Sequence, residues 1–319
     1  VAYRFFATEA RKFIVADCPG HEQYTRNMVT GASTADAAVI LIDARKGVLT
    51  QTRRHSFLCH RLGIREMVLA VNKMDLVDFS QDRFDAIEAE YRAFAEELGI
   101  DRITAIPLAA VSGDNIATRS EAMAWWDGPT LISHLEAIPV RGDTGQDAPF
   151  RLPVQWVNRP HQDFRGFAGQ IAGGRIAPGD AVRILPSGST TTVKAIPGFD
   201  GDRDEAQAGD SITLTLADEV DCSRGDVIAS ADDPPEVADQ FEATIVWMDA
   251  QPLKPGRGYW LKLGTQTVTA TIAEPKYEIN LNTMAKLAAT SLGLNSIGVA
   301  EVTTERRIVF EPYDVNPTL

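Results

Sequence analysis

Two short polar motifs each follow an apolar run of the chain. The motif Asp17-Cys18-Pro19-Gly20-His21 comes directly after residues 13–16, and Asn72-Lys73-Met74-Asp75 comes directly after residues 67–71. In an open parallel sheet, ligands bind beyond the carboxyl ends of the strands. If both runs are strands of such a sheet, both motifs are expected to face one ligand crevice.

The residue types of the first motif suit a phosphate group and its metal ion. The Asp17 carboxylate is a ligand of the kind that Mg²⁺ takes, usually through water because this ion dehydrates reluctantly. Gly20 allows the backbone to come close to an oxyanion and to offer its N–H. The alternative interpretation is an ordinary Asp-x-Pro-Gly turn at the end of a strand.

The second motif suits a guanine base. The Asp75 carboxylate can accept both the N1 and the 2-amino hydrogens of guanine, a bidentate pair that adenine does not offer. The aliphatic stem of Lys73 can cover the base while its ammonium stays in water. The Asn72 amide can join neighbouring loops through hydrogen bonds.

A parallel sheet is needed to bring the two motifs together, and the first part of the chain predicts one. Nearly continuous apolar runs, which are typical of buried parallel strands, occupy residues 13–16, 37–42, 67–71 and 106–111. The segments 51–62 and 80–98 between them have the 3.6-residue period of amphipathic helices, and Ser80 is a suitable N-cap. Strands that alternate with helices predict an open parallel sheet with helices on both faces.

The rest of the chain predicts β structure. A polar, glycine-rich linker is expected at residues 141–148, and runs such as 211–216, 241–247 and 265–272 then approach the period of two that strands have. The Asp-Asp-Pro-Pro stretch 232–235 is a second boundary. We therefore predict three domains, an α/β domain at 1–140 and two β-barrel domains at 149–232 and 236–319.

Composition narrows the class of protein. The net charge of −13 argues against a protein that grips nucleic acid, because phosphate neutralisation needs a basic surface. Three widely spaced cysteines without metal-ligand spacing fit a reducing, cytoplasmic setting. The longest apolar run is far shorter than a bilayer span, and no signal-peptide pattern precedes the first strand, so neither membrane insertion nor secretion is expected. Because the chain opens on Val1, its true N-terminus is expected upstream.

The motifs resemble those of GTPases of the translation-factor class. Asp17-x-Pro-Gly20 and Asn72-Lys73-x-Asp75 are similar to the third and fourth nucleotide motifs of these proteins. The resemblance implies that His21 orients the attacking water; the alternative is a solvated histidine at a helix start. Ala109-Ala110-Val111 lies where the family supports guanine through a Ser-Ala pair, and Ala109 here replaces the serine, which leaves the N–H of Ala110. The implied GTP contacts are Asp17, Cys18, Pro19, Gly20, Asn72, Lys73, Asp75, Ala109, Ala110 and Val111.

Longer segments narrow the resemblance. Residues 20–28, 43–48 and 51–55 are similar to the GTPase large subunits of bacterial ATP sulfurylase, and residues 125–131 and 224–228 extend the match. This family resemblance implies a truncated P-loop GTPase domain followed by two β barrels, with GTP and Mg²⁺ as cofactors. It also implies that GTP hydrolysis drives the formation of adenosine 5'-phosphosulfate from ATP and sulfate on a smaller catalytic subunit.

Coupling of this kind needs an element that moves, and the helix after Gly20 is the expected one. Its exposed residues are expected to face the partner subunit; they are Glu22, Gln23, Tyr24 and Arg26.

One part of the family pattern is missing from this sequence. A phosphate-gripping loop needs Gly-Lys followed by Ser or Thr, and no glycine here is followed by lysine. We expect this loop upstream of Val1 and the end of the third domain beyond Leu319. Two alternatives stay open: an elongation-factor GTPase that carries aminoacyl-tRNA, and a scaffold that does not hydrolyse nucleotide.

Overall fold

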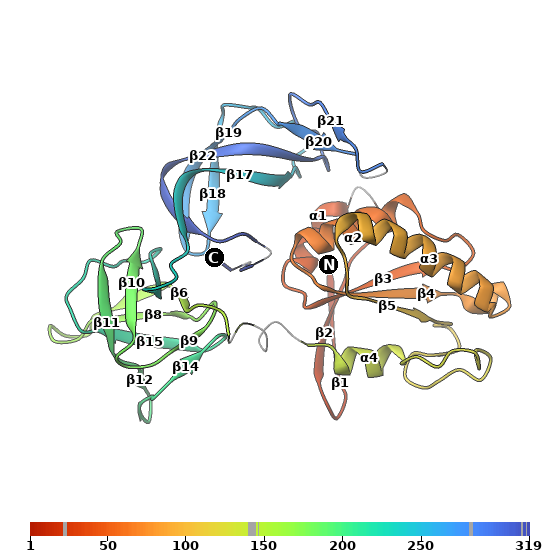
Figure 1. Ribbon diagram of the computed structural model, residues 1–319, viewed down its shortest axis with the longest axis horizontal. Helices are drawn as coiled ribbons and strands as arrows, with labels where there is room; N and C mark the ends of the chain where they lie inside the picture. The colour runs from red at the N-terminus through yellow and green to blue at the C-terminus, as the bar shows by residue number, and fades with distance from the viewer. Residues whose placement is uncertain (22–23, 140–144, 146, 281–282, 314, 317) are drawn as a thin grey trace.

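The computed structural model describes residues 1–21, 24–139, 145, 147–280, 283–313, 315–316 and 318–319. Glu22 and Gln23 of the expected moving helix, and most of the expected linker at 141–148, therefore lie outside the described residues. The chain forms a mixed α/β part followed by two β parts (Figure 1).

The α/β part contains the two long helices that the residue pattern favours, and each of the four predicted apolar runs overlaps a strand. Its elements are, in chain order, β1 (Ala2–Ala7), β2 (Lys12–Asp17), α1 (Thr25–Ala32), β3 (Ala37–Asp43), α2 (Thr50–Arg61), β4 (Glu66–Asn72), η2 (Met74–Val77), α3 (Gln81–Leu98), β5 (Ile103–Pro107) and α4 (Leu131–Ala137). The helices predicted at 51–62 and 80–98 are confirmed as α2 and α3. The Ser80 hydroxyl caps α3 by accepting a hydrogen bond from the Arg83 N–H.

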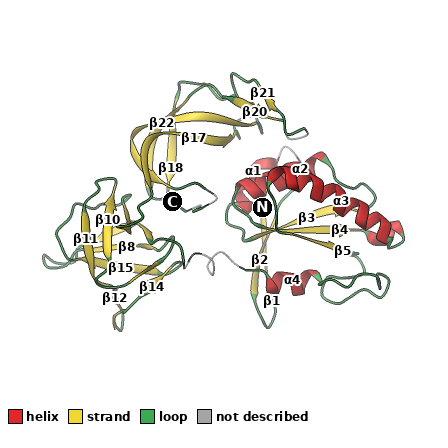
Figure 2. Cartoon of the chain, viewed as in Figure 1, coloured by secondary structure: helices red, strands yellow, loops and turns green. Residues whose placement is uncertain are grey.

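A three-stranded parallel sheet, in the order β3-β4-β5, forms the centre of this part. The strand β4 is buried on both faces, because helices cover the sheet from both sides (Figure 2). Met67 and Leu69 pack in the same core as Phe84 of α3. Val68 and Ala70 point the other way, into a cluster that includes Leu131 and Leu135 of α4.

Two predicted strands differ from the structure. Residues 13–16 were expected to be a buried parallel strand, but β2 pairs antiparallel with β1 in a separate two-stranded sheet, and Ile14 is 69% exposed. The reason is local, since a tight turn at Thr8 and Arg11 joins the two strands directly. The run 106–111 also ends early: β5 stops at Pro107, and the next residues turn.

The second part of the chain is antiparallel. Its seven-stranded sheet has the order β6-β16-β10-β11-β15-β8-β7, with two short ribbons beside it. The strands are β6 (Arg151–Pro153), β7 (Trp156–Asn158), β8 (Gly166–Gln170), β9 (Arg175–Ile176), β10 (Ala181–Leu185), β11 (Thr190–Ala195), β12 (Pro197–Gly198), β13 (Gly201–Asp202), β14 (Ala206–Gln207), β15 (Ser211–Leu216) and β16 (Val227–Ser230). The strand predicted at 211–216 is confirmed as β15.

The third part is a six-stranded antiparallel sheet. Its strands are β17 (Glu236–Val246), β18 (Gly258–Leu263), β19 (Gln266–Ile272), β20 (Tyr277–Ile279), β21 (Lys286–Leu287) and β22 (Ile297–Phe310). The runs predicted at 241–247 and 265–272 fall in β17 and β19.

A buried ion pair joins the two β parts. Arg151 of β6 donates from Nε and Nη2 to Oε1 of Glu311, at 2.9 and 2.8 Å, and its side chain is only 3% exposed. Leu185, Val227 and Val309 form a small shared apolar cluster at the same junction. Among the helices of the described residues, we find none with the length and apolar character that crossing a membrane requires.

Candidate guanine-nucleotide site

The carboxyl ends of the three parallel strands bring the second motif together with the loops on either side of it. In the register of the sheet, Asp43 at the end of β3 lies beside Asn72 at the end of β4. Residues 108–110 follow β5, and the Leu108 N–H donates to the Val71 carbonyl at 2.8 Å. The structure thus gathers the predicted residues 72–75 and 109–111 at the carboxyl end of the sheet.

Asn72 holds two of these loops with one side-chain oxygen. Its Oδ1 accepts hydrogen bonds from the N–H of Lys73 at 2.7 Å and from the N–H of Ala110 at 3.0 Å. The Ala110 N–H, which the resemblance offered to guanine, is therefore used inside the chain in this structure. Ala109 beside it is fully buried, whereas Val111 is exposed.

Lys73 and Asp75 are placed at the surface by a buried residue between them. Lys73 adopts a left-handed backbone conformation with φ of 65°, and its side chain is 46% exposed. Met74 is fully buried and anchors the turn. No hydrogen bond or ion pair joins the exposed Asp75 carboxylate to another described residue. A carboxylate left open beside an anchored loop is available to a ligand.

Asp43 and Arg45 lie at the same end of the sheet, although neither is among the predicted site residues. The Arg45 guanidinium donates to both carboxylate oxygens of Asp43, at 2.9 and 2.6 Å, and Lys73 Nζ donates to Oδ2 at 3.0 Å. These hydrogen bonds, that of Arg45 first, hold the pKa of Asp43 well below its usual range. The signal that could have revealed Asp43 is its position as the last residue of an apolar run, the same position that drew attention to Asp17.

The first motif begins where β2 ends. Asp17 and Gly20 are exposed, and Pro19 is half-buried. The Cys18 thiol packs on Gly31 of α1 so closely that a Cβ at residue 31 would lie 2.4 Å from its sulfur. This contact fixes the loop against the helix that follows it.

His21 is exposed, and its carbonyl accepts a hydrogen bond from the Tyr24 N–H at 2.9 Å. A second histidine lies nearby, because a Cβ added at Gly20 would be 3.9 Å from Cε1 of His55 on α2. Burial lowers the pKa of His55, which favours its neutral imidazole.

The two motifs lie in different sheets, since β2 pairs with β1 and β4 pairs with β3 and β5. Within the described residues, no hydrogen bond or ion pair connects 17–21 with 72–75. The same residues contain no group of three or more His, Cys, Asp or Glu side chains arranged to hold a metal ion. Asp17 supplies one carboxylate of the kind that Mg²⁺ takes, usually through water.

The adjacent tryptophans Trp125 and Trp126 have a structural role. Trp125 and Trp126 pack on Phe84, and their indole N–H groups donate to the carbonyls of Phe79 and Pro129. Both tryptophans are thus satisfied by core packing, in a turn and not on a ligand surface.

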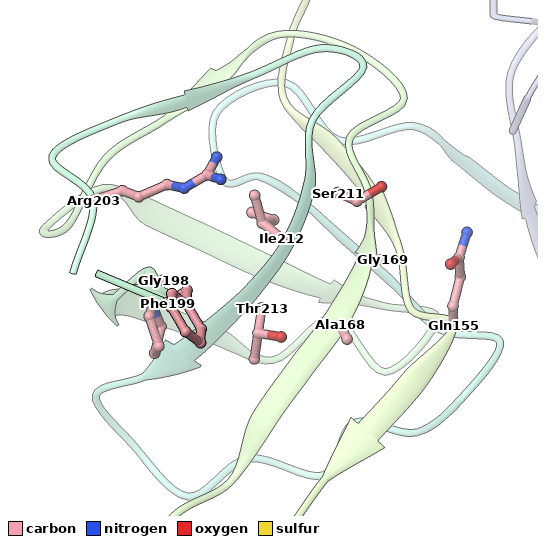
Figure 3. A pocket seen from close by; sticks show the side chains of 10 residues that line it. Gln155, Ala168, Gly169, Gly198, Phe199, Arg203, Ser211, Ile212 and Thr213 are labelled. Atoms are coloured by element: carbon pink, nitrogen blue, oxygen red, sulfur yellow. The ribbon is translucent and has the colours of Figure 1, made fainter. Parts of the chain in front are cut away.

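A shallow hollow of about 420 Å³ lies on the second part of the chain (Figure 3). The fully exposed Phe199 and the Arg203 side chain stand at its rim, and Ile212 forms part of its floor. None of the predicted site residues lines it.

Comparison with known protein families matches both ends of the chain. Residues 1–139 match the family "Elongation factor Tu GTP binding domain", and residues 240–319 match "GTP-eEF1A C-terminal domain-like". A solved structure of sup35 complexed with GDP has the same fold, with a TM-score of 0.51 at 23% identity over 99% of this chain and 78% of that one. The predicted fold class, an α/β GTPase-type domain followed by β domains, is confirmed.

Curated relatives match along the whole chain. "Bifunctional enzyme CysN/CysC" of Xylella fastidiosa is 54% identical over 100% of this chain and 51% of its own length. "Bifunctional enzyme NodQ" of Rhizobium sp. strain N33 is likewise 54% identical, over 49% of its own length. "Sulfate adenylyltransferase subunit 1" of Aeromonas salmonicida is 51% identical over 100% of this chain and 68% of that protein. The chain thus spans about half the length of the bifunctional relatives.

Proposed function

The chain belongs to the sulfate adenylyltransferase subunit 1 family, and on this premise we propose that it binds and hydrolyses GTP to support sulfate adenylation. One observation carries the nucleotide part of the proposal. The Asp75 carboxylate is open to solvent beside Lys73, on a loop that Asn72 ties to Ala110.

Asp75 reads the base in this proposal. Its two oxygens accept the N1 and 2-amino hydrogens of guanine, and Lys73 covers the ring with its stem. The base loop is organised before any ligand arrives, which reduces the entropy that binding must remove. Asn72 contributes indirectly, by fixing the loop. The Ala110 N–H takes part in this by donating its hydrogen bond to Asn72 Oδ1.

His21 acts on water in the proposal. An exposed imidazole directly after Gly20 can orient a water molecule toward the terminal phosphate, while the Gly20 N–H faces that phosphate. Asp17 would hold Mg²⁺, usually through water, and the ion when bound supplies positive charge to the phosphate oxygens. Cys18 fixes the loop through the packing of its thiol on Gly31, and Pro19 follows it in the same loop.

The phosphates need a binding loop that residues 72–75 do not supply. The outer strand β3 leaves room for another strand that could carry this loop. Among the described strands, β3 pairs only with β4, and Leu41 of β3 is 65% exposed. An unpaired edge with exposed apolar side chains favours pairing with another strand. We propose that a strand leading into a Gly-Lys-Ser or Gly-Lys-Thr loop pairs with β3 and brings the phosphate cradle to the ends of β3 and β4.

Adenylyl transfer takes place on a separate, smaller catalytic subunit in this proposal. GTP and GDP can influence that subunit only if the two states present different surfaces to it. The helix α1 is the element we expect to respond, because it starts close to Gly20. Tyr24, the N-cap residue of α1, is 46% exposed and is available to a partner.

The test uses the complete protein, the smaller subunit, ATP, sulfate, Mg²⁺ and either GTP or GDP, and it measures adenosine 5'-phosphosulfate. We expect more product with GTP than with GDP, and a smaller difference when Tyr24 is replaced by alanine. Equal product with the two nucleotides would refute the coupling. Capture of aminoacyl-tRNA that depends on GTP would instead support an elongation-factor role.

A further inference from the structure

The carboxylate of Asp43 is the centre of a charged cluster at the carboxyl ends of β3 and β4, beside the proposed guanine site. Four donors reach it: the Arg45 backbone N–H at 3.0 Å, Arg45 Nε at 2.9 Å, Arg45 Nη2 at 2.6 Å and Lys73 Nζ at 3.0 Å. Both oxygens of the carboxylate are used. Lys73, which belongs to the guanine motif, is thus bound to a residue of the neighbouring strand.

Asp43 is the fixed member of this cluster. Its side chain is only 16% exposed, whereas those of Lys73 and Arg45 are 46% and 47% exposed. Its backbone carbonyl accepts hydrogen bonds from the N–H groups of Lys46 and Gly47, at 2.9 and 3.0 Å. A carboxylate held by its strand and its own turn can restrain a mobile cation.

The helix α3 holds the turn that carries Asp43 and Arg45. Arg83 of α3 donates from Nε to the Ala44 carbonyl at 2.7 Å, so the turn that carries Asp43 and Arg45 is tied to the body of the domain. The Ala44 N–H donates in addition to the Asn72 carbonyl at 2.9 Å. The turns after β3 and β4 therefore keep a constant relation to each other.

Restraint matters for a lysine that must cover a base. A free lysine side chain has many rotamers, and ordering it on binding costs affinity. With the ammonium already held by Asp43 at 3.0 Å, the Lys73 side chain has fewer rotamers to lose when a base arrives.

We propose that Asp43 is a positioning residue of the guanine site, which acts through Lys73 and is itself held in place by Arg45. The inference rests on the proposed function, since it concerns the same base site. It implies that Asp43 affects GTP and GDP equally, because both present the same base, and that it does not affect the hydrolysis step.

The test measures dissociation constants of fluorescent GTP and GDP for the full-length protein and its variants. Asp43→Asn should weaken both nucleotides by the same factor, about three- to tenfold, which corresponds to one hydrogen-bonded interaction. The hydrolysis rate at saturating GTP should be unchanged. The matched control is Glu66→Gln, because Glu66 is 15% exposed and pairs with Arg102 at the opposite end of β4, and this variant should bind like the wild type.

A double-mutant cycle separates positioning from general damage. In a Lys73→Met background, Asp43→Asn should cause no further loss, because the residue it acts through is gone. Losses that add in the double variant, or an Asp43→Asn variant that binds like Glu66→Gln, would overturn the inference.

A second variant protects the test against poor folding. Asp43→Glu keeps the charge and moves it by one methylene, so its affinity should lie between those of the wild type and of Asp43→Asn. Affinity no better than that of Asp43→Asn would contradict the inference. A wild-type protein that binds no guanine nucleotide, or an Asp75→Asn variant with unchanged base preference, would instead refute the proposed function.

Discussion

The Arg26 guanidinium donates a hydrogen bond of 2.6 Å to the carbonyl of Met248. The contact joins α1, the helix that follows Gly20 and His21, to the loop after β17 in the third part of the chain. Arg26 was expected to face a partner subunit, and in this structure it holds two parts of the same chain together. A shift of α1 would therefore be felt in the third part.

Replacement of Arg26 by alanine should loosen this junction. We expect faster amide hydrogen exchange in α1 and around residues 246–249, because the helix loses its tie to the loop. Tyr24→Ala is the matched control, since Tyr24 makes no side-chain hydrogen bond to another described residue. Identical exchange in the two variants would show that the Arg26 contact has no mechanical role.

Asp75→Asn in the complete protein should change the base preference from guanine to xanthine. The amide accepts from N1–H but offers a donor where guanine has its amine, so GTP should weaken by roughly 10²-fold while xanthosine triphosphate gains. Competition of the two nucleotides against a fluorescent GDP measures this. A variant that still prefers GTP would remove Asp75 as the base reader.

His21→Ala should slow hydrolysis while affinity changes little. Water orientation acts on the transition state, so single-turnover rates should fall by about 10² to 10⁴, with dissociation constants close to those of the wild type. His161→Ala is a suitable control, since His161 is exposed in the second part of the chain. Wild-type turnover of the His21 variant would leave His21 as an ordinary surface histidine.

Residues 1–319 alone should bind GTP weakly. They contain the proposed base contacts at 72–75 but no Gly-Lys pair for the phosphates. Calorimetry with GTP and Mg²⁺ should give a dissociation constant well above the micromolar range. Sub-micromolar binding would mean that another group in this chain grips the phosphates.

Acid should destabilise the fold through two half-buried histidines, His55 and His134. Burial lowers the pKa of His55 and of His134, so the unfolded chain binds protons at these sites more readily than the folded chain does. Stability from these groups is complete above the unfolded pKa of about 6.5 and is lost as pH falls below it. The thermal midpoint should therefore drop between pH 7.5 and pH 5.5, and less so in a His55→Gln variant. An identical drop in that variant would exclude His55 as a source.

Local patterns predicted much of this structure because the governing forces are local. The 3.6-residue period and the Ser80 cap defined α3, and apolar runs defined β3 and β4. The pairing partner of a strand does not follow from its local pattern. Residues 13–16 are as apolar as a buried strand, but a short turn gave β2 an antiparallel neighbour that periodicity could not reveal.

In the candidate site, too, the residue types could be predicted from sequence, whereas the contacts between distant residues could not. The residue types of Asn72 and Asp75 suggested their chemistry, whereas the role of Asp43 depends on the register that sets it beside Asn72. The bond from the Ala110 N–H to Asn72 likewise needs three-dimensional information, since the two residues are 38 positions apart. Sequence motifs predicted the groups that meet a ligand, and the sheet determined which groups hold them in place.

The ion pair between Arg151 and Glu311 constrains how the two β parts can change in evolution. Loss of either residue alone would leave the other charge enclosed without its counter-ion, whereas replacing both with apolar residues of similar volume is often tolerated. The two positions lie 160 residues apart. They are therefore expected to covary among descendants of this chain, so that a recombination event between residues 151 and 311 succeeds only when both parents carry compatible halves of the pair.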